Sequence, residues 1–279
     1  MGIINSQILF KVENLHKSFI INKRIFQANY NINLSIFKQE TLSIIGESGS
    51  GKSTLGQLII QLQKNNHGNV WYFPENNLNI NLSMLKPSQM KIWRPDLQII
   101  FQNSFSALNP KFKIRDIIGE GLIIHRKVLG YKDPRYHQQI IDIMNKCGLS
   151  LDLMERYPAE LSGGQRQRVN IAKTLILKPK FVVCDEIVSA LDVTVQKQIL
   201  DLLNDFKNRY KITYLFISHD LGVAQYISDR IGVMYQGQLV ELASTKEIFQ
   251  KPMHFYTKSL LNAIPRIPCY ETSNFKNFF

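Results

Sequence analysis

The sequence is poor in cysteine and contains no long hydrophobic run. Cys147, Cys184 and Cys269 lie far apart and form no metal-binding spacing, so we expect free thiols and a cytosolic location. No apolar segment approaches the ~18 residues that a transmembrane helix needs. Residues 1–6 lack the basic start and the cleavage site of a signal peptide. The sequence alone therefore predicts neither a secreted nor a membrane-spanning protein.

The rest of the composition is ordinary for a soluble globular chain. Hydrophobic residues make up 44% and charged residues 20%, and 279 residues suffice for one large α/β domain or two small ones. The formal net charge of +12 is compatible with a nucleic-acid partner, an anionic membrane surface or a lysine-rich solvated face. Because the basic residues are spread along the chain, charge does not choose among these.

A phosphate-binding loop is the clearest feature of the chain. Residues 46–54 satisfy G-x-x-x-x-G-K-[ST], with a buried-strand run before them and apolar residues at helical spacing after them. This order surrounds one point with backbone N–H groups and a positive helix end, which suits a triphosphate. Lys52 can reach the β- and γ-phosphates, and the Ser53 hydroxyl can hold Mg²⁺. The loop residues are Gly46, Glu47, Ser48, Gly49, Ser50, Gly51, Lys52, Ser53 and Thr54.

Two carboxylates follow another predicted buried strand. Residues 181–184 are apolar, and Asp185 and Glu186 come directly after them. Parallel sheets bind ligands at the carboxyl ends of their strands. Asp185 can therefore bind Mg²⁺, directly or through water, and Glu186 can act as a general base toward a water molecule. The simpler alternative is that the two acids cap the next turn.

A second anion site is predicted where a helix begins after Leu161. Ser162 is a suitable N-cap, and two glycines leave the N-terminus of the helix open. We expect this helix to end near Pro179. The simpler alternative is a capped helix with no ligand. The residues at its start are Ser162, Gly163, Gly164 and Gln165.

The remaining strands are assigned from alternation and from short apolar runs. Residues 8–13 and 31–37 look like an antiparallel edge that precedes the nucleotide strand, and residues 64–95 look like a surface excursion with weak strand character at 69–73. The other predicted strands are 97–101, which precedes Gln102, 213–218, which precedes His219, and a hairpin of 231–235 with 238–241.

Two stretches have helical periodicity. No strand interrupts residues 112–157, so a helical subdomain is inserted into the α/β core, and residues 255–264 form a short amphipathic helix. Single residues indicate a function only together with the other motifs. His219 could hydrogen-bond a γ-phosphate, and Phe19 could be either a core aromatic or a residue on which adenine stacks. The tail from residue 265 to 279 has no periodicity.

Taken together, these motifs resemble an ATP-binding cassette (ABC) ATPase over residues 8–265. The resemblance implies an α/β fold with a P-loop NTPase (RecA-like) core, an antiparallel β edge and an inserted α-helical subdomain. It places an ABC ATPase domain at 1–244, with the core at about 1–102 and 167–244 and the helical subdomain at about 103–166. Residues 245–279 would be a C-terminal extension of the oligopeptide-transporter type.

The resemblance also assigns site residues. Residues 46–54 match the Walker A loop, and Gln102 is the Q-loop glutamine. The signature is Leu161 with Ser162, Gly163, Gly164 and Gln165. Asp185 ends the Walker B strand, Glu186 is the catalytic glutamate, residues 189–192 with Asp192 are the D-loop, His219 is the switch histidine and Phe19 stacks on adenine. The catalytic set would be Glu186, His219, Lys52 and Gln102, and Mg²⁺ would be held by Ser53, Gln102 and Asp185.

A narrower resemblance is to the peptide/nickel importer branch of this family, which includes oligopeptide, dipeptide and microcin C transporters. It rests on residues 101–110, 157–166, 189–196 and 254–265. It implies an ATPase that powers import of peptides or peptide-like compounds across the inner membrane, or alternatively import of nickel or metal chelates. An ABC ATPase that acts on nucleic acid or the ribosome would suit the charge, but the chain has one cassette and no C-x-x-C.

The resemblance further implies partners. Two ATPase subunits, identical or different, would pair head to tail so that ATP on the Walker A loop of one is closed over by the signature of the other. Two transmembrane permease subunits and an extracytoplasmic substrate-binding protein are expected, with no nucleic acid. This places the chain peripherally at the cytoplasmic face of the inner membrane.

Three residues depart from the family pattern. Ile187 stands where proline usually follows the glutamate, Lys173 replaces an arginine, and Gln39 replaces a glycine before the nucleotide strand. None of these changes removes a catalytic group. Some members carry a cysteine cluster for an iron–sulfur centre in the tail, but only Cys269 is present there, so we expect no such centre.

Overall fold

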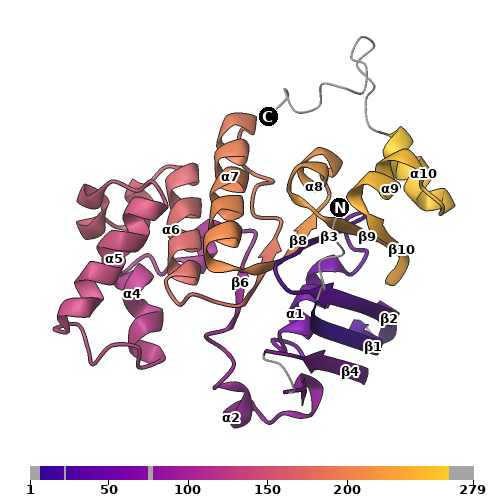
Figure 1. Cartoon of the computed structure of the whole chain (residues 1–279), viewed down its shortest axis with the longest axis horizontal. Coiled ribbons are helices and arrows are strands. Elements are labelled where there is room, and N and C mark those ends of the chain that lie inside the picture. Colours follow the sequence, from indigo (N-terminus) through magenta and orange to yellow (C-terminus); the bar gives the residue numbers. More distant parts are fainter. Residues whose placement is uncertain (1–6, 22, 75–77, 264–279) are drawn as a thin grey trace.

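The strands of the protein form two sheets, one of six strands and one of four (Figure 1). The computed structural model describes residues 7–21, 23–74 and 78–263. Within these residues the helices cover both faces of the six-stranded sheet, and the four-stranded sheet lies beside helix α1 (Lys52–Ile59).

The six-stranded sheet carries the predicted nucleotide strand at its centre. Its order is β10-β9-β3-β8-β7-β6, and every neighbouring pair is parallel except β9 with β10. Strands β3, β7 and β8 are buried along their whole length, which explains their unbroken apolar runs. The carboxyl ends of β6, β7, β3 and β8 therefore meet at one edge. The strands are β3 (Thr41–Ile45), β6 (Leu97–Ile100), β7 (Phe181–Asp185), β8 (Thr213–Ser218), β9 (Arg230–Tyr235) and β10 (Gln238–Ser244).

Side chains of β7 and β8 alternate between two apolar clusters, one on each face of the sheet. Val182 and Phe216 point into a cluster with the helices, whereas Val183 and Leu215 point into a cluster with α1 and the small sheet. A third cluster lies over the end of β3 and includes α8 (Leu221–Ile227). Because successive side chains of a strand point to opposite faces, an entirely apolar strand packs against an apolar layer on each side of the sheet.

The four-stranded antiparallel sheet contains the predicted antiparallel strands and is larger than the sequence indicated. Its strand order is β2-β1-β4-β5. Strands β1 (Ile8–Ile21) and β2 (Arg24–Phe37) form one long hairpin, and the other two strands are β4 (His67–Tyr72) and β5 (Ile80–Asn81). The predicted antiparallel strands at 8–13 and 31–37 are therefore confirmed, but they extend further than predicted and belong to a sheet of their own. Register shifts along β1 interrupt the alternation, which is why only the strand ends were recognised.

The segment predicted as a surface excursion contributes to this sheet. Strand β4 pairs with β1 and buries Val70 and Tyr72 completely. The Tyr72 ring stacks on Phe10 with ring centroids 4.9 Å apart. The weak strand character predicted at 69–73 is thus confirmed, and this part of the predicted excursion contributes Val70 and Tyr72 to the core. The short helices that follow are η1 (Leu82–Met84) and α2 (Pro87–Met90).

Residues between β6 and β7 are helical, as their periodicity predicts. The helices are α3 (Ser104–Ala107), α4 (Ile114–Ile124), α5 (Pro134–Lys146), η2 (Leu151–Glu155), η3 (Pro158–Glu160) and α6 (Gly163–Leu175). They gather on the left of Figure 1, next to α7 (Val193–Tyr210). Their apolar residues form one continuous cluster with β7, β8 and α7, so this group of helices does not have a core of its own.

The C-terminal part follows the β9–β10 hairpin, which the sequence predicted. Two short helices come next, α9 (Thr245–Gln250) and α10 (Phe255–Asn262). The predicted helix 255–264 is confirmed as far as Asn262. Its last residue, the predicted non-periodic tail and Cys269 lie outside the described residues.

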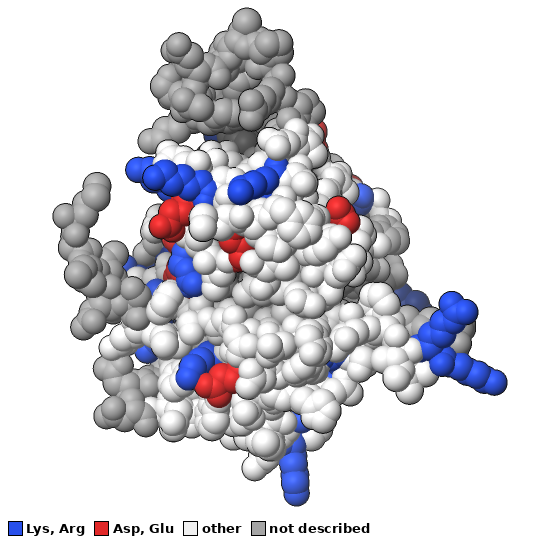
Figure 2. Space-filling model, turned by 90° about the vertical axis from the view of Figure 1, so that its right-hand side faces the viewer, with Lys and Arg blue, Asp and Glu red and all other residues white. Residues whose placement is uncertain are grey.

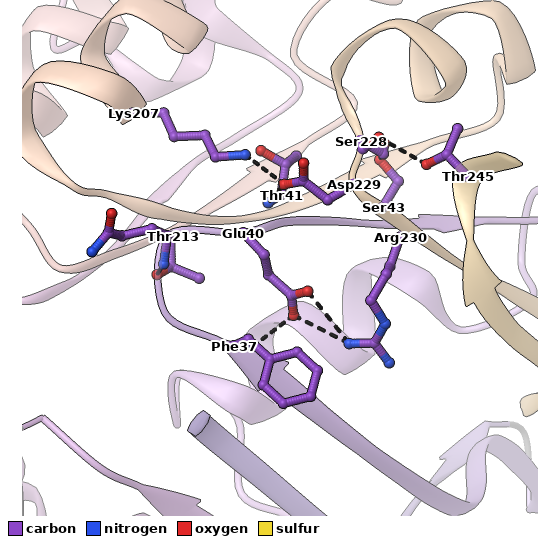
Figure 3. A network of polar contacts seen from close by, with 11 residues as sticks. Phe37, Glu40, Thr41, Ser43, Lys207, Thr213, Ser228, Asp229, Arg230 and Thr245 are labelled. Carbon is purple, nitrogen blue, oxygen red and sulfur yellow. Dashed lines mark hydrogen bonds and ion pairs between the residues drawn. The ribbon is translucent and has the colours of Figure 1, made fainter. Parts of the chain in front are cut away.

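A polar network ties the amino end of β3 to its neighbours (Figure 3). The Glu40 carboxylate accepts a hydrogen bond from Phe37 N–H at 2.6 Å and lies 3.3 Å from Arg230 Nη1. Asp229 accepts from Thr41 N–H at 2.8 Å and pairs with Lys207 at 2.5 Å. Burial raises the pKa of Glu40, and Arg230 opposes this. The network joins both sheets at the end of β3 away from the phosphate loop.

The surface and the helix lengths add two observations. No helix in the described ranges is both long and apolar enough to cross a membrane. Figure 2 shows the side of the molecule at the right of Figure 1, where the described Lys and Arg side chains lie singly or in small groups, some of them beside Asp or Glu, with uncharged surface between them.

Candidate nucleotide site

The phosphate loop connects β3 to α1, and two of its glycines are required by the surrounding backbone. Gly46 has φ +148°, and a Cβ there would lie 2.2 Å from Met234 O. Gly51 has φ +97°, and its Cβ would lie 2.0 Å from Ala28 O. Neither approach depends on a ligand, so β9 and β2 hold the loop in shape by contact. Ser48, Gly49 and Ser50 form the turn between them, and Thr54 lies in α1.

The Lys52 side chain folds back over this loop. Its Nζ donates to Gly46 O at 2.8 Å and to Glu47 O at 2.7 Å, and the residue is 4% exposed. Burial lowers the pKa of Lys52, while the charges of Glu186, Asp185 and Glu47 oppose this. An ammonium that is held by neutral carbonyls retains a strong preference for anionic oxygens. The Lys52 ammonium thus lies over the loop, and its binding of phosphate stays a prediction.

Ser53 and Asp185 meet across the space between α1 and β7. Ser53 Oγ donates to Asp185 Oδ1 at 2.8 Å. Burial raises the pKa of Asp185, and the neighbouring Glu186 charge adds to the rise. Hydroxyl and carboxylate oxygens are hard ligands, and a divalent cation would relieve this crowding of negative charge, so the pair fits Mg²⁺. Among the described residues no group of three or more His, Cys, Asp or Glu could hold a metal, so phosphate or water oxygens would complete the shell.

The ends of three parallel strands converge on Glu186. Gln102 follows β6 and donates from Nε2 to Glu186 Oε2 at 2.9 Å, and His219 follows β8 with Nδ1 at 3.2 Å from the same oxygen. These contacts bring the ends of the three strands together at one carboxylate oxygen. Gln102 bonds Glu186 here, while its amide oxygen, the atom that would bind a cation, is not used in that bond.

Glu186 adopts a left-handed backbone conformation, with φ +48°. Its N–H donates to Ile217 O at 3.0 Å, and its carbonyl accepts from Ser189 Oγ at 3.0 Å. Ile187, which replaces the proline of the family pattern, is 2% exposed and packs in the core. The strained conformation is therefore held by hydrogen bonds and by burial of Ile187, without a proline ring.

The signature residues form a well-capped helix start. Ser162 Oγ accepts from Gln165 N–H at 3.3 Å, Gln165 Oε1 accepts from Ser162 N–H at 2.9 Å, and Ser162 is exposed. Both the predicted N-cap and the predicted helix are confirmed, with the helix ending at Leu175. Asp192 caps α7 close by, since a Cβ on Gly164 would lie 3.0 Å from Val195 Cγ1.

The structure does not bring the signature to the phosphate loop of the same chain. Helix α6 packs against α3, α4, α5 and β6, whereas α1 packs against β2, β7 and β8. In Figure 1 α6 lies among the helices on the left and α1 lies below the sheet beside the small sheet. Gly163 is close only to the loop before α7, where its Cβ would lie 3.9 Å from Leu191. The helix that Ser162 caps and the helix that begins at Lys52 therefore pack in different parts of the fold.

Phe19 lies in β1, one strand away from the phosphate loop. It pairs with Phe26 of β2, and two residues further along β2 the Ala28 carbonyl touches Gly51. Lys17 Nζ lies 5.0 Å from the centre of the Phe19 ring, which is half-buried. The ring is therefore not a core aromatic, and the neighbouring strand β2 contacts the loop.

Several contacts of the phosphate loop come from residues that the sequence did not mark. Asn29 Nδ2 donates to Gly51 O at 3.2 Å, and Gly237 N–H donates to Ser50 O at 3.2 Å. Tyr256 Oη accepts from Glu47 N–H at 3.1 Å. All three lie far from the loop in the chain and belong to no local motif. Their roles became visible only when the elements were assembled.

The fold and this site define a class, a P-loop ATPase of the ATP-binding cassette type. Comparison with known proteins agrees: the family model described as ABC transporter matches residues 30–189. The chain therefore belongs to the ABC transporter family, as one of its ATP-binding subunits, and it hydrolyses ATP.

Relatives cover nearly the whole chain. It is 42% identical over 257 residues to the oligopeptide transport ATP-binding protein OppF of Bacillus subtilis. The aligned region covers 92% of this chain and 82% of OppF. The chain is 40% identical over 260 residues to the dipeptide transport ATP-binding protein DppF of Lactococcus lactis, with 91% and 80% covered. The resemblance to the ABC family is thus confirmed.

A solved structure supports the fold. The dimeric post-hydrolysis state of the ATP-binding cassette MJ0796, bound to ADP and Pi, superposes with a TM-score of 0.75 at 29% identity. The match covers 85% of this chain and 99% of that one. The predicted P-loop NTPase fold of the ABC type is confirmed.

Proposed function

We propose that this chain is the ATPase subunit that powers import of peptides or peptide-like compounds across the inner membrane. The observation that carries the proposal is its similarity to peptide-transport ATP-binding proteins over more than nine-tenths of its length. Its catalytic residues are complete, so it supplies both halves of a working site to a pair of ATPase subunits.

ATP binds between two such subunits, head to tail. The separation of Ser162 from Lys52 within one chain supports this arrangement, because each helix start then lies free to meet the phosphates held by a second chain. Phe19 stacks on adenine, and residues 46–54 hold the phosphates. The partner contributes Ser162, Gly163, Gly164 and Gln165, with Asp192 beside them.

Hydrolysis is phosphoryl transfer to water. Glu186 polarises the water, and Gln102 and His219 orient the Glu186 carboxylate through the contacts described above. Lys52 neutralises charge on the phosphates. When bound, Mg²⁺ would neutralise phosphate charge, and Ser53 and Asp185, with the Gln102 amide oxygen, are the groups that would hold it.

The chain acts at the cytoplasmic face of the membrane, bound to two permease subunits and served by an extracytoplasmic substrate-binding protein. No described helix crosses the membrane, so the permeases must supply the path. We assign residues 1–244 to the ATPase domain, with about 103–166 as the helical subdomain that contacts the permeases, and 245–279 to the C-terminal extension. No nucleic acid takes part.

The test is ATPase activity of the complex in proteoliposomes. The chain is purified in complex with the proposed permeases and binding protein, and peptides, nickel chelates and RNA are added in turn. Peptides with their binding protein should raise ATP turnover severalfold, and Glu186→Gln should remove that activity. Stimulation by nickel chelates alone would show that the transported substrate is a nickel chelate and not a peptide. Stimulation by RNA without permeases would refute the transport proposal.

A further inference from the structure

The C-terminal helix reaches back to the phosphate loop. Tyr256, the second residue of α10, lies 209 positions after Glu47, yet its Oη accepts the Glu47 N–H at 3.1 Å. Tyr256 is 5% exposed and belongs to the same apolar cluster as Ile45, the last residue of the strand that leads into the loop. The phenol side of the contact is therefore buried, although Glu47 itself is exposed, and a partly shielded hydrogen bond is stronger than one in open water.

The segment before α10 is fixed to the sheet. The Glu241 carboxylate of β10 accepts the N–H groups of Met253 at 2.8 Å and of His254 at 3.0 Å. His254 Nδ1 in turn accepts the N–H of Tyr256 at 3.2 Å and so caps the helix. The Tyr256 ring lies against Tyr235, with centroids 4.2 Å apart. Backbone, cap and ring together leave the Tyr256 hydroxyl little freedom.

The bond acts on one particular peptide unit, the one between Gly46 and Glu47. Its N–H is held by Tyr256, and its carbonyl oxygen, Gly46 O, accepts Lys52 Nζ at 2.8 Å. A peptide unit is planar, with N–H and C=O pointing in opposite directions. Holding the N–H therefore fixes the direction of the carbonyl that positions the Lys52 ammonium.

We propose that Tyr256 is a positioning residue of the nucleotide site, which acts through the Gly46–Glu47 peptide on Lys52. The C-terminal extension is then part of the ATP-binding machinery and not merely an appendage. The inference rests on the ATPase activity of the chain and is independent of which compound is transported.

The test compares two substitutions that each remove one phenolic hydroxyl from the same ring pair. Tyr256→Phe removes the acceptor for Glu47 N–H. Tyr235→Phe is the matched control, because the Tyr235 hydroxyl accepts only from the exposed Gln236 side chain, at 3.3 Å, among the bonds of the described residues. Full-length chain, with its partner ATPase if one is required, is assayed well below the melting temperature of each variant.

We expect Tyr256→Phe to raise the KM for ATP and the Kd for a fluorescent ATP analogue roughly 3- to 10-fold, the effect of one partly buried hydrogen bond, with kcat changed less than about twofold. Tyr235→Phe should leave all three within about twofold. An unchanged KM in Tyr256→Phe, a loss confined to kcat, or an equal rise in both variants would overturn the proposal.

A second measurement keeps the route through Lys52 testable. In a Lys52→Ala background, which already lacks the ammonium, adding Tyr256→Phe should change the Kd for the ATP analogue by less than about twofold. If the two effects instead multiply, Tyr256 acts on the loop independently of Lys52 and the assigned route is wrong.

Discussion

Replacing Glu186 by Gln tests the centre of the proposed mechanism. The substitution keeps the shape of the side chain and keeps an oxygen that can accept from Gln102, whose Nε2 lies 2.9 Å from Glu186 Oε2. It removes the negative charge and the ability to accept a proton from water. The expected result is binding without turnover.

The size of the effect follows from the contacts. A positioned general base contributes about 10²- to 10⁴-fold, so we expect kcat to fall at least roughly a hundredfold. ATP affinity should be retained or increased, because Lys52 and Ser53 keep their contacts and the Glu186 charge that raises the pKa of Asp185 is gone.

The assay is phosphate release for kcat, combined with equilibrium binding of a fluorescent ATP analogue. Glu155→Gln is a suitable control, since it removes a carboxylate that is ion-paired with Lys113 and Arg115 on the helical segment, away from the site. Turnover within a few-fold of the unmodified chain in Glu186→Gln would refute the assigned base. Loss of binding together with turnover would instead show that Glu186 supports the loop.

Two further predictions concern stability and are both checked by urea unfolding. Gly51→Ala should cost about 3 kcal/mol and abolish ATP binding, because its Cβ would lie 2.0 Å from Ala28 O, whereas Gly49→Ala, with φ +80° but nothing within 4 Å, should cost only about 1 kcal/mol. Equal losses would show that strain alone matters. Arg230→Met leaves Glu40 buried without its cation, which raises the pKa of Glu40 further. A carboxyl group whose pKa is higher in the folded than in the unfolded protein destabilises the fold as pH rises. The free energy of unfolding should therefore fall by about 3 kcal/mol at pH 7.5, and this loss should shrink as pH falls toward about 4.5. A loss independent of pH would contradict this.

Much of the core was predictable because its signals are local. The buried strands β3, β7 and β8 are short apolar runs with a loop motif or a carboxylate directly after them. The start of α6 was predictable because an N-cap and its hydrogen-bond partner are three residues apart. In each case the residues that cause the structure are neighbours in the chain.

The small antiparallel sheet was not predictable in the same way. Its long strands contain bulges, with positive φ at Asn14 and Asn31, so alternation is lost over short windows. Strand β4 is identified by its partner β1, about 55 residues earlier, and not by its own composition. Pairing over such a distance leaves no periodic trace in either segment.

The sequence by itself determined which chemical groups are present and in what order: a phosphate loop, a carboxylate pair, a capped helix start, and single Gln and His residues after strands. Tertiary structure alone decided that Gln102 and His219 share one oxygen of Glu186, that the helices beginning at Ser162 and Lys52 pack against different elements, and that Tyr256 holds the peptide behind Lys52. The physical reason is that motifs are set by contacts within a few residues, whereas these relations depend on how parallel strands align and on where the C-terminal helix packs.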